Sequence, residues 1–285
     1  MAQGGDFGWA KPIMQAGYSG RGLVYTVIGG VVVWAIWHGG TADGVKGAFR
    51  TLETTTGGGL VLALIVIGMA AYALWRVLDA AFDLEDYGSD AKGAVARAGM
   101  VVTGLTHLLI GLVALTLLIG APGDASGGSN LVRGVSTVMS WPFGRWLVGL
   151  GGALTVAAGI YYFAKAYRMS YLQHLRGNAV TARWNDLLRA GVAAQGLVVT
   201  TVGAFLLLAA RAADPGRAGG MGQTFSWISG QPYGRILVTL LALGLICFAL
   251  FCFVNARYRI VPKAEGGDIE TLGARLKAKA EAAAR

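Results

Sequence analysis

Long apolar windows alternate along the chain with short polar or glycine-rich segments. Six windows of mostly apolar residues lie at roughly residues 17–37, 60–78, 99–121, 146–167, 191–210 and 236–254. Each has about the 20 residues that a helix needs to cross the hydrocarbon core of a bilayer. The pattern therefore predicts an all-α membrane protein with six transmembrane helices in a single domain.

A glycine register opens the first, third and fifth windows. Each copy reads Ala-Gly, then a glycine five residues later followed by Leu, then a glycine seven residues further, and the copies begin at Ala16, Ala98 and Ala190. A repeat of two spans inserts each time in the same orientation, so the three copies can be pseudo-threefold about the membrane normal. The predicted organisation is an arm at 1–15, repeats at 16–97, 98–189 and 190–262, and a basic tail at 263–285.

The register glycines that lie seven residues apart share one face of their helices. Small residues let membrane helices approach closely, and the resulting van der Waals contact replaces the missing hydrophobic drive. We therefore expect helix packing at Gly22, Gly29, Gly104, Gly111, Gly196 and Gly203. The alternative is that these close backbones line a groove for a lipid or pigment.

Two of the repeats share a second landmark before their second helix. The segment 141–145 reads Trp-Pro-Phe-Gly-Arg and the segment 231–235 reads Gln-Pro-Tyr-Gly-Arg, whereas the first repeat lacks this signal. The three Ala-Gly-x4-Gly-Leu helices, each paired with a helix that ends in a Tyr- and Arg-rich exit such as 255–259, resemble the bacterial family called domain of unknown function 1206. The resemblance covers nearly all of residues 10–262. It implies a six-helix bacterial membrane protein and carries no activity with it.

Composition and charge agree with a membrane protein. Hydrophobic residues make up 55% of the chain and charged residues 14%, below the roughly 25% usual in soluble domains. The net charge of +9 arises from loops, and 17 of the 24 Lys and Arg residues fall on the side that holds both termini. Since Lys and Arg are enriched in cytoplasmic loops, we expect both termini in the cytoplasm of an inner-membrane protein and no nucleic-acid partner.

Five residues near the start of the odd-numbered spans are candidates for ligand binding. Arg21, Thr103 and Gln195 are equivalent, one residue before the middle glycine, and Tyr25 and His107 lie one turn deeper. Arg21 either extends to lipid headgroups at the cytoplasmic interface or serves as a cation in a central site. We expect the first helices of the repeats to gather around the axis with the second helices outside.

His107 is the one histidine within a predicted span. It either bonds to a helix carbonyl or to Thr103, or it holds a cofactor such as haem or a chlorin. No second axial ligand is apparent, because His38 falls at the opposite membrane face and His174 in a loop. The cofactor is left unknown, and no metal site is predicted.

The second helices end in aromatic and basic residues. Interfacial anchoring explains the tyrosines Tyr72, Tyr161, Tyr162 and Tyr167. Arg76 and Asp79, three residues apart on one helix, should pair with each other. In the tail, Ile269, Leu272 and Leu276 form a narrow apolar stripe, which fits either a short amphipathic helix or a solvated tail.

The sequence shows no nucleophile elbow, phosphate-binding glycine loop or Cys/His metal pattern, so no catalytic residue is predicted. The leading hypothesis is a non-enzymatic membrane protein that binds a lipid, quinone or pigment, or that serves as an accessory subunit of a larger membrane complex. The alternative is a small-solute channel or transporter, which would need a polar lining along several helices.

Overall fold

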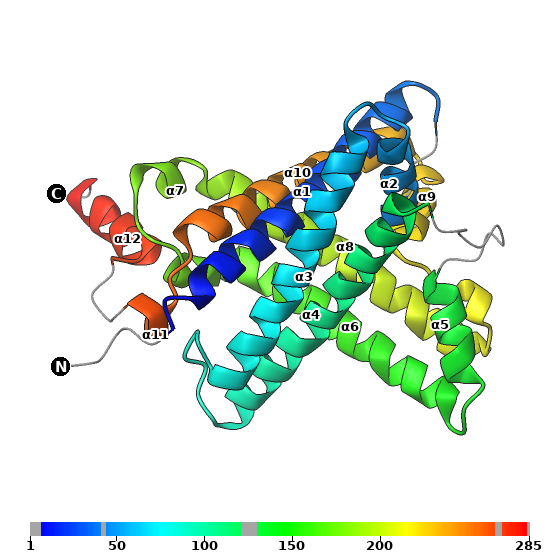
Figure 1. Cartoon of the computed structure of the whole chain (residues 1–285), viewed down its shortest axis with the longest axis horizontal. Helices are drawn as coiled ribbons and strands as arrows, with labels where there is room; N and C mark the ends of the chain where they lie inside the picture. The colour runs from blue at the N-terminus through cyan, green and yellow to red at the C-terminus, as the bar shows by residue number, and fades with distance from the viewer. Residues whose placement is uncertain (1–6, 41–43, 121–129, 266–269, 284–285) are drawn as a thin grey trace.

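The chain folds into helices that run between two ends of one bundle (Figure 1). The computed structural model describes residues 7–40, 44–120, 130–265 and 270–283. Within these residues six helices are long and apolar enough to cross a membrane: α1 (Ala10–Trp37), α3 (Gly58–Phe82), α4 (Ala91–Leu118), α6 (Gly144–Arg168), α8 (Asn185–Ala212) and α10 (Gly234–Tyr258). The predicted all-α fold with six spans is confirmed.

The three repeats are built to the same dimensions. Their first helices, α1, α4 and α8, each have 28 residues, and their second helices, α3, α6 and α10, each have 25. At 1.5 Å per residue these are about 42 and 37 Å long, so they cross a core of about 30 Å with tilt. Helix α1 begins at Ala10, and the predicted arm 1–15 therefore includes its first turns, where Ala10 and Met14 are fully buried.

A short helix and a tight turn precede each second helix. The short helices are α2 (Val45–Glu53), α5 (Asn130–Met139) and α9 (Met221–Ser229). The residues that follow them, Gly57, Phe143 and Tyr233, have φ of 80°, 61° and 60°. The next residue is glycine each time, because a Cβ there would collide with a carbonyl oxygen of the preceding short helix. The first repeat thus makes the same turn through Gly57, although its sequence lacks the Pro-aromatic signal.

The six spans form a row in which first and second helices alternate. Neighbours follow the order α6, α8, α10, α1, α3, α4, so each second helix packs against the first helix of the next repeat, and α10 packs against α1. The expectation that the first helices gather on the axis is wrong, because the register glycines of α1, α4 and α8 pack against second helices instead. The six predicted packing glycines all lie against a neighbouring helix in this way; a Cβ on Gly203, for example, would lie 2.6 Å from the Val156 nitrogen.

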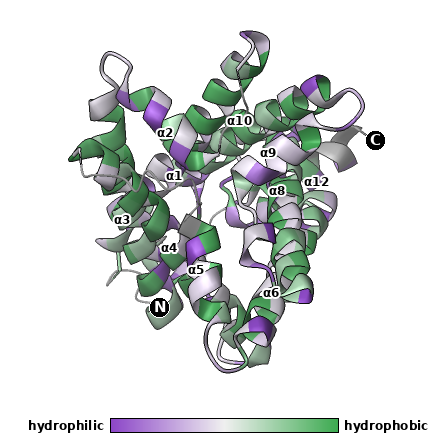
Figure 2. Ribbon diagram, turned by 90° about the vertical axis from the view of Figure 1, so that its right-hand side faces the viewer, coloured by the Kyte–Doolittle hydropathy of each residue, from purple (hydrophilic) through white to green (hydrophobic). Residues whose placement is uncertain are grey.

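The second repeat differs from the other two. Helices α1 and α3 pack together, as do α8 and α10, whereas the fully described helices α4 and α6 do not pack along their lengths. Figure 2, which looks onto the end that holds α2, α5 and α9, shows α4 and α6 apart. The arrangement is therefore a ring of six spans that is open at one place.

The end of the bundle at which α1 begins is covered by the connection after α6 and by the tail. The connection contains η1 (Ser170–His174) and α7 (Ala179–Arg183), and the tail contains α11 (Pro262–Glu265) and α12 (Leu272–Ala283). Leu272 is fully buried and donates its backbone N–H to the Leu175 oxygen at 2.7 Å. The tail is thus a docked helix from Leu272 onward, while Ile269 lies outside the described residues. A further short turn, η2 (Pro215–Arg217), precedes α9.

Candidate functional site

The side chain of Arg21 lies inside the bundle and is 3% exposed. Its Nη1 donates to the hydroxyl of Tyr72 on α3 at 3.0 Å, and its Nη2 donates to the hydroxyl of Tyr162 on α6 at 3.5 Å. The guanidinium also lies over the ring of Phe248 on α10, 4.9 Å from the centroid. Arg21 therefore turns inward and joins three helices, rather than extending to the membrane surface.

Three of the other predicted residues meet around Arg21. Gln195 donates to the hydroxyl of Tyr25 at 3.0 Å, and the ring of Tyr25 stands edge-on to Phe248 at 4.9 Å. The ring of His107 lies 4.8 Å from that of Tyr72, the tyrosine to which Arg21 donates. Arg21, Tyr25, His107 and Gln195 thus belong to one connected group of buried side chains.

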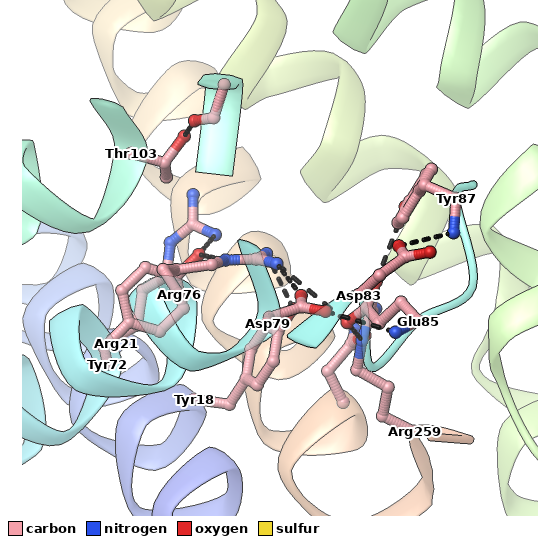
Figure 3. Close-up of polar contacts among 12 residues, drawn as sticks. Tyr18, Arg21, Tyr72, Arg76, Asp79, Asp83, Glu85, Tyr87, Thr103 and Arg259 are labelled. Carbon is pink, nitrogen blue, oxygen red and sulfur yellow. Dashed lines mark hydrogen bonds and ion pairs between the residues drawn. The ribbon is translucent and has the colours of Figure 1, made fainter. Parts of the chain in front are cut away.

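Thr103 contributes to this group only through its backbone. Its hydroxyl donates to the Gly99 carbonyl at 2.7 Å, and its own carbonyl oxygen lies 2.8 Å from Nδ1 of His107. Figure 3 shows its side chain apart from Arg21. The bond to the Thr103 carbonyl fixes the His107 ring, as one of the sequence interpretations expected.

Polar atoms without a partner are concentrated here. Across the described residues, four buried side-chain nitrogen or oxygen atoms lack a hydrogen bond, and three of them are Nε of Arg21, Nε2 of His107 and Oε1 of Gln195. Buried polar groups are nearly always paired, so each exception requires an explanation. Nε of Arg21 is a donor, whereas Oε1 of Gln195 is an acceptor, as is Nε2 in the neutral ring of His107, because Nδ1 donates to the Thr103 carbonyl. A head group that carries both an acceptor oxygen and a hydroxyl donor matches this set.

A second polar cluster continues from Tyr72 toward the end at which α1 begins (Figure 3). Arg76 donates to the hydroxyls of Tyr72 and Tyr18 at 3.1 and 2.9 Å, and to Asp79 at 3.3 Å. The predicted pair of Arg76 and Asp79 is confirmed. Arg76 also lies 3.9 Å from Glu85, a residue to which no sequence pattern points.

Glu85 and Arg259 form a buried ion pair at the edge of this cluster. Arg259 donates to both carboxylate oxygens of Glu85, and its Nη1 donates to Asn255 at 2.7 Å. Burial alone would raise the pKa of Glu85, but the charge and hydrogen bonds of Arg259, with the charge of Arg76, lower that pKa to about 2. The pair connects the exit of the first repeat to the exit of the third, 174 residues away.

Asp79 and Glu85, the two carboxylates of the polar cluster, are thus each paired with an arginine. The contacts of Arg21 are of a different kind. In the described part of the chain its partners are tyrosine hydroxyls and aromatic rings, with no carboxylate among them. A cation that is buried without a counter-charge is costly in a membrane interior. This arrangement favours an anionic or carbonyl-bearing partner for Arg21.

The exit tyrosines, all expected to anchor the helices at the interface, fall into two groups in the structure. Tyr161 and Tyr167 are exposed, in keeping with that interpretation, while Tyr72 is fully buried and Tyr162 is half-buried against Arg21. Alignment on the glycine that starts each second helix could have identified Tyr72 as an inward residue, because Tyr72 then occupies the same position as Phe248. Glu85 and Arg259 lie outside the spans, and only tertiary structure brings them together.

The described residues hold no group of three or more His, Cys, Asp or Glu side chains that could bind a metal. Cys247 and Cys252 are both free thiols. Around Arg21 the site consists of a buried cation, tyrosine hydroxyls and aromatic rings.

Fold and site together define a multi-pass, all-α membrane protein made of three two-helix repeats around a buried polar centre. The family described as Domain of Unknown Function (DUF1206) matches three times, at residues 16–83, 98–169 and 190–259. The chain belongs to this family. It is also 29% identical over 255 residues, 88% of this chain and 92% of the relative, to "Uncharacterized protein YxxB" of Bacillus subtilis (strain 168). No solved structure matches the chain.

Proposed function

We propose that this protein is a non-enzymatic inner-membrane protein that binds one anionic or carbonyl-bearing amphiphile, with both termini in the cytoplasm. The class comprises lipids, quinones and pigments, and the ligand's polar head lies against Arg21. The observation that carries the proposal is the buried guanidinium of Arg21, which has hydroxyl partners but no carboxylate, beside unpartnered atoms of His107 and Gln195.

The chemistry of the site fits one bound head group better than a stream of ions. A carboxylate, phosphate or carbonyl oxygen accepts from guanidinium and hydroxyl groups, and charge-assisted bonds of this kind are the stronger ones. The tyrosines that hold Arg21 come from α3 and α6, and Gln195 and Phe248 come from α8 and α10, so the site is assembled from all three repeats. The rings of Tyr25 and Phe248 lie over the guanidinium of Arg21, with their centroids 5.8 and 4.9 Å from its central carbon.

Native mass spectrometry of protein purified in mild detergent tests the proposal. The wild type should carry one amphiphile per chain, and Arg21→Gln should lower its occupancy at least tenfold. Arg168→Gln, which removes an exposed cation at the end of α6, is the matched control and should retain the ligand. His107→Ala provides a second variant that leaves the arginine in place, and its occupancy should also fall.

A different result would favour transport. If the protein carries no amphiphile, and reconstituted vesicles show solute flux that His107→Ala abolishes, the binding proposal is wrong. Equal occupancy in the wild type and in Arg21→Gln would also refute it, because the ligand would then not depend on the buried cation.

A further inference from the structure

The first and second helices of repeats 1 and 3 cross through small residues. Gly20 of α1 lies against Gly68 of α3, where a Cβ on either would collide with the other backbone. In the third repeat a Cβ on Gly244 of α10 would lie 2.6 Å from the Cβ of Ala194 on α8. Such small residues let the helix backbones approach closely.

The equivalent positions in the second repeat carry large residues. They are Val102 of α4, three residues after Gly99, and Leu154 of α6, ten residues after the glycine that starts its helix. Both are 63% exposed. A Cβ added to Gly99 would have no other atom within 4 Å. Its equivalents Gly17 and Gly191, in contrast, lie against α3 and α10. Side chains of this size do not fit the close crossing seen in repeats 1 and 3, and α4 and α6 do not pack along their lengths.

On α6, the face that is equivalent to the core-facing sides of α3 and α10 is made of small residues. Counting 7, 11 and 14 residues from the first glycine of the helix, α3 and α10 have large core side chains, all buried: Ile65, Met69, Tyr72, Leu241, Leu245 and Phe248. The same positions of α6 are Gly151, Thr155 and Ala158. Ala158 is exposed, and an added Cβ on Gly151 would meet nothing within 4 Å. The open side of the ring therefore has a row of small residues along one wall.

This row ends at the polar site. One turn beyond Ala158 on α6 is Tyr162, which accepts from Arg21. Helix α4, on the other side of the opening, carries His107, whose Nε2 is buried without a partner. The row of small residues thus leads along α6 to the turn that contacts Arg21, so it is apolar along its length and ends at polar side chains.

We propose that the opening between α4 and α6 is a lateral entrance from the bilayer, and that it holds the long hydrocarbon chain of an amphiphile whose head binds at Arg21. The inference rests on the proposed function, and it adds the position of the tail and the route of entry. From Ala158 to the start of α6 the helix rises about 21 Å over 14 residues, which suits a long acyl or isoprenoid chain. The polar site at Arg21 favours an amphiphile over a partner helix, because an amphiphile has a head group that can bind there.

A photoreactive lipid tests the position of the tail. The probe is phosphatidylglycerol with a diazirine in its acyl chain, added at one equivalent to the purified protein in detergent, and adducts are located by peptide mass spectrometry. The wild type should be labelled on α4 and α6 within residues 107–118 and 151–158. Arg21→Gln should reduce this labelling at least tenfold while exposed sites on the outer faces stay labelled.

A variant that fills the row provides the decisive comparison. Gly151→Leu with Ala158→Phe introduces the residues that α10 has at these positions, and it should reduce labelling between α4 and α6 at least tenfold. Ala153→Leu with Ala157→Leu places similar bulk on exposed positions of the same helix and should change nothing. Melting temperatures of both variants near that of the wild type would show that each one folds.

The outcomes distinguish the two proposals. If labelling depends on Arg21 but falls elsewhere than on α4 and α6, or persists in the filled variant, the head site stands and the entrance is wrong. If no labelling depends on Arg21, the proposed function fails. If a photoreactive residue at Leu154 cross-links to protein rather than lipid in native membranes, a partner helix occupies the opening and the inference is overturned.

Discussion

Substitution of Glu85 by Gln should strongly destabilise the protein. The Glu85 side chain is fully buried and Arg259 is 6% exposed, so the change leaves the arginine charge inside the protein without its counter-charge. Glu85 also lies 3.9 Å from Arg76, whose guanidinium would lose part of its compensation as well.

The expected effect follows from the burial of this pair. Removing one partner of a buried ion pair costs about 3–5 kcal/mol, because the remaining charge stays desolvated. In domains of 150–250 residues each kcal/mol lowers Tm by about 2–4 °C, so Glu85→Gln should lower Tm by about 6–20 °C. Replacing both residues by Leu should recover part of this loss, since no charge is then left unpaired.

Thermal unfolding in detergent, followed by light scattering and by intrinsic fluorescence, measures the effect. Glu53→Gln on α2 removes an exposed carboxylate and should shift Tm by less than about 2 °C. A similarly small shift for Glu85→Gln would show that the contact with Arg259 does not hold the exits of the first and third repeats together.

Three further predictions concern topology, packing and pH. Because 17 of the 24 basic residues lie on the side of the termini, reporter fusions after Gly219 should report the outside, and a cytoplasmic signal would contradict the assignment. Gly196→Leu should lower Tm through an overpacking cost of about 1–3 kcal/mol, because an added Cβ would lie 3.2 Å from the Gly159 oxygen. Gly30→Leu should be tolerated, because a Cβ added there would have no atom within 4 Å. Burial and the charge of Arg259 lower the pKa of His174 from 6.5 to about 4, so the unfolded chain binds this proton first as the pH falls. Stability should therefore decrease from about pH 6.5 to pH 4, by up to about 1.4 kcal/mol per pH unit, and His174→Gln should flatten this part of the profile.

The fold could be predicted because its signals are local. The six apolar windows and the glycine register fix the spans and the repeat from short stretches of sequence. The order of the helices could not be predicted in this way, because a glycine face shows that a helix packs closely but does not name the partner. Gly22 packs against Phe253 of α10, across the whole length of the chain.

The site could be predicted in part for the same reason. Arg21, His107 and Gln195 stand out because polar side chains are rare in the spans. Tyr72 and Tyr162 look like interfacial tyrosines in the sequence, and their contacts with Arg21 become apparent only in the tertiary structure. In the sequence, Arg259 is one of several basic residues after the last span. Its role depends on Glu85, a carboxylate in another repeat.

The pairing of α10 with α1 has a consequence for the order in which the protein can be completed during synthesis. Helix α1 enters the membrane first, yet the helix against which Gly22 and Gly29 pack is translated last of the six. Tyr162, a partner of Arg21, arrives only with α6. Until then Arg21 lacks part of its contacts, and a chain that stops before α10 leaves Gly22 and Gly29 without the helix against which they pack.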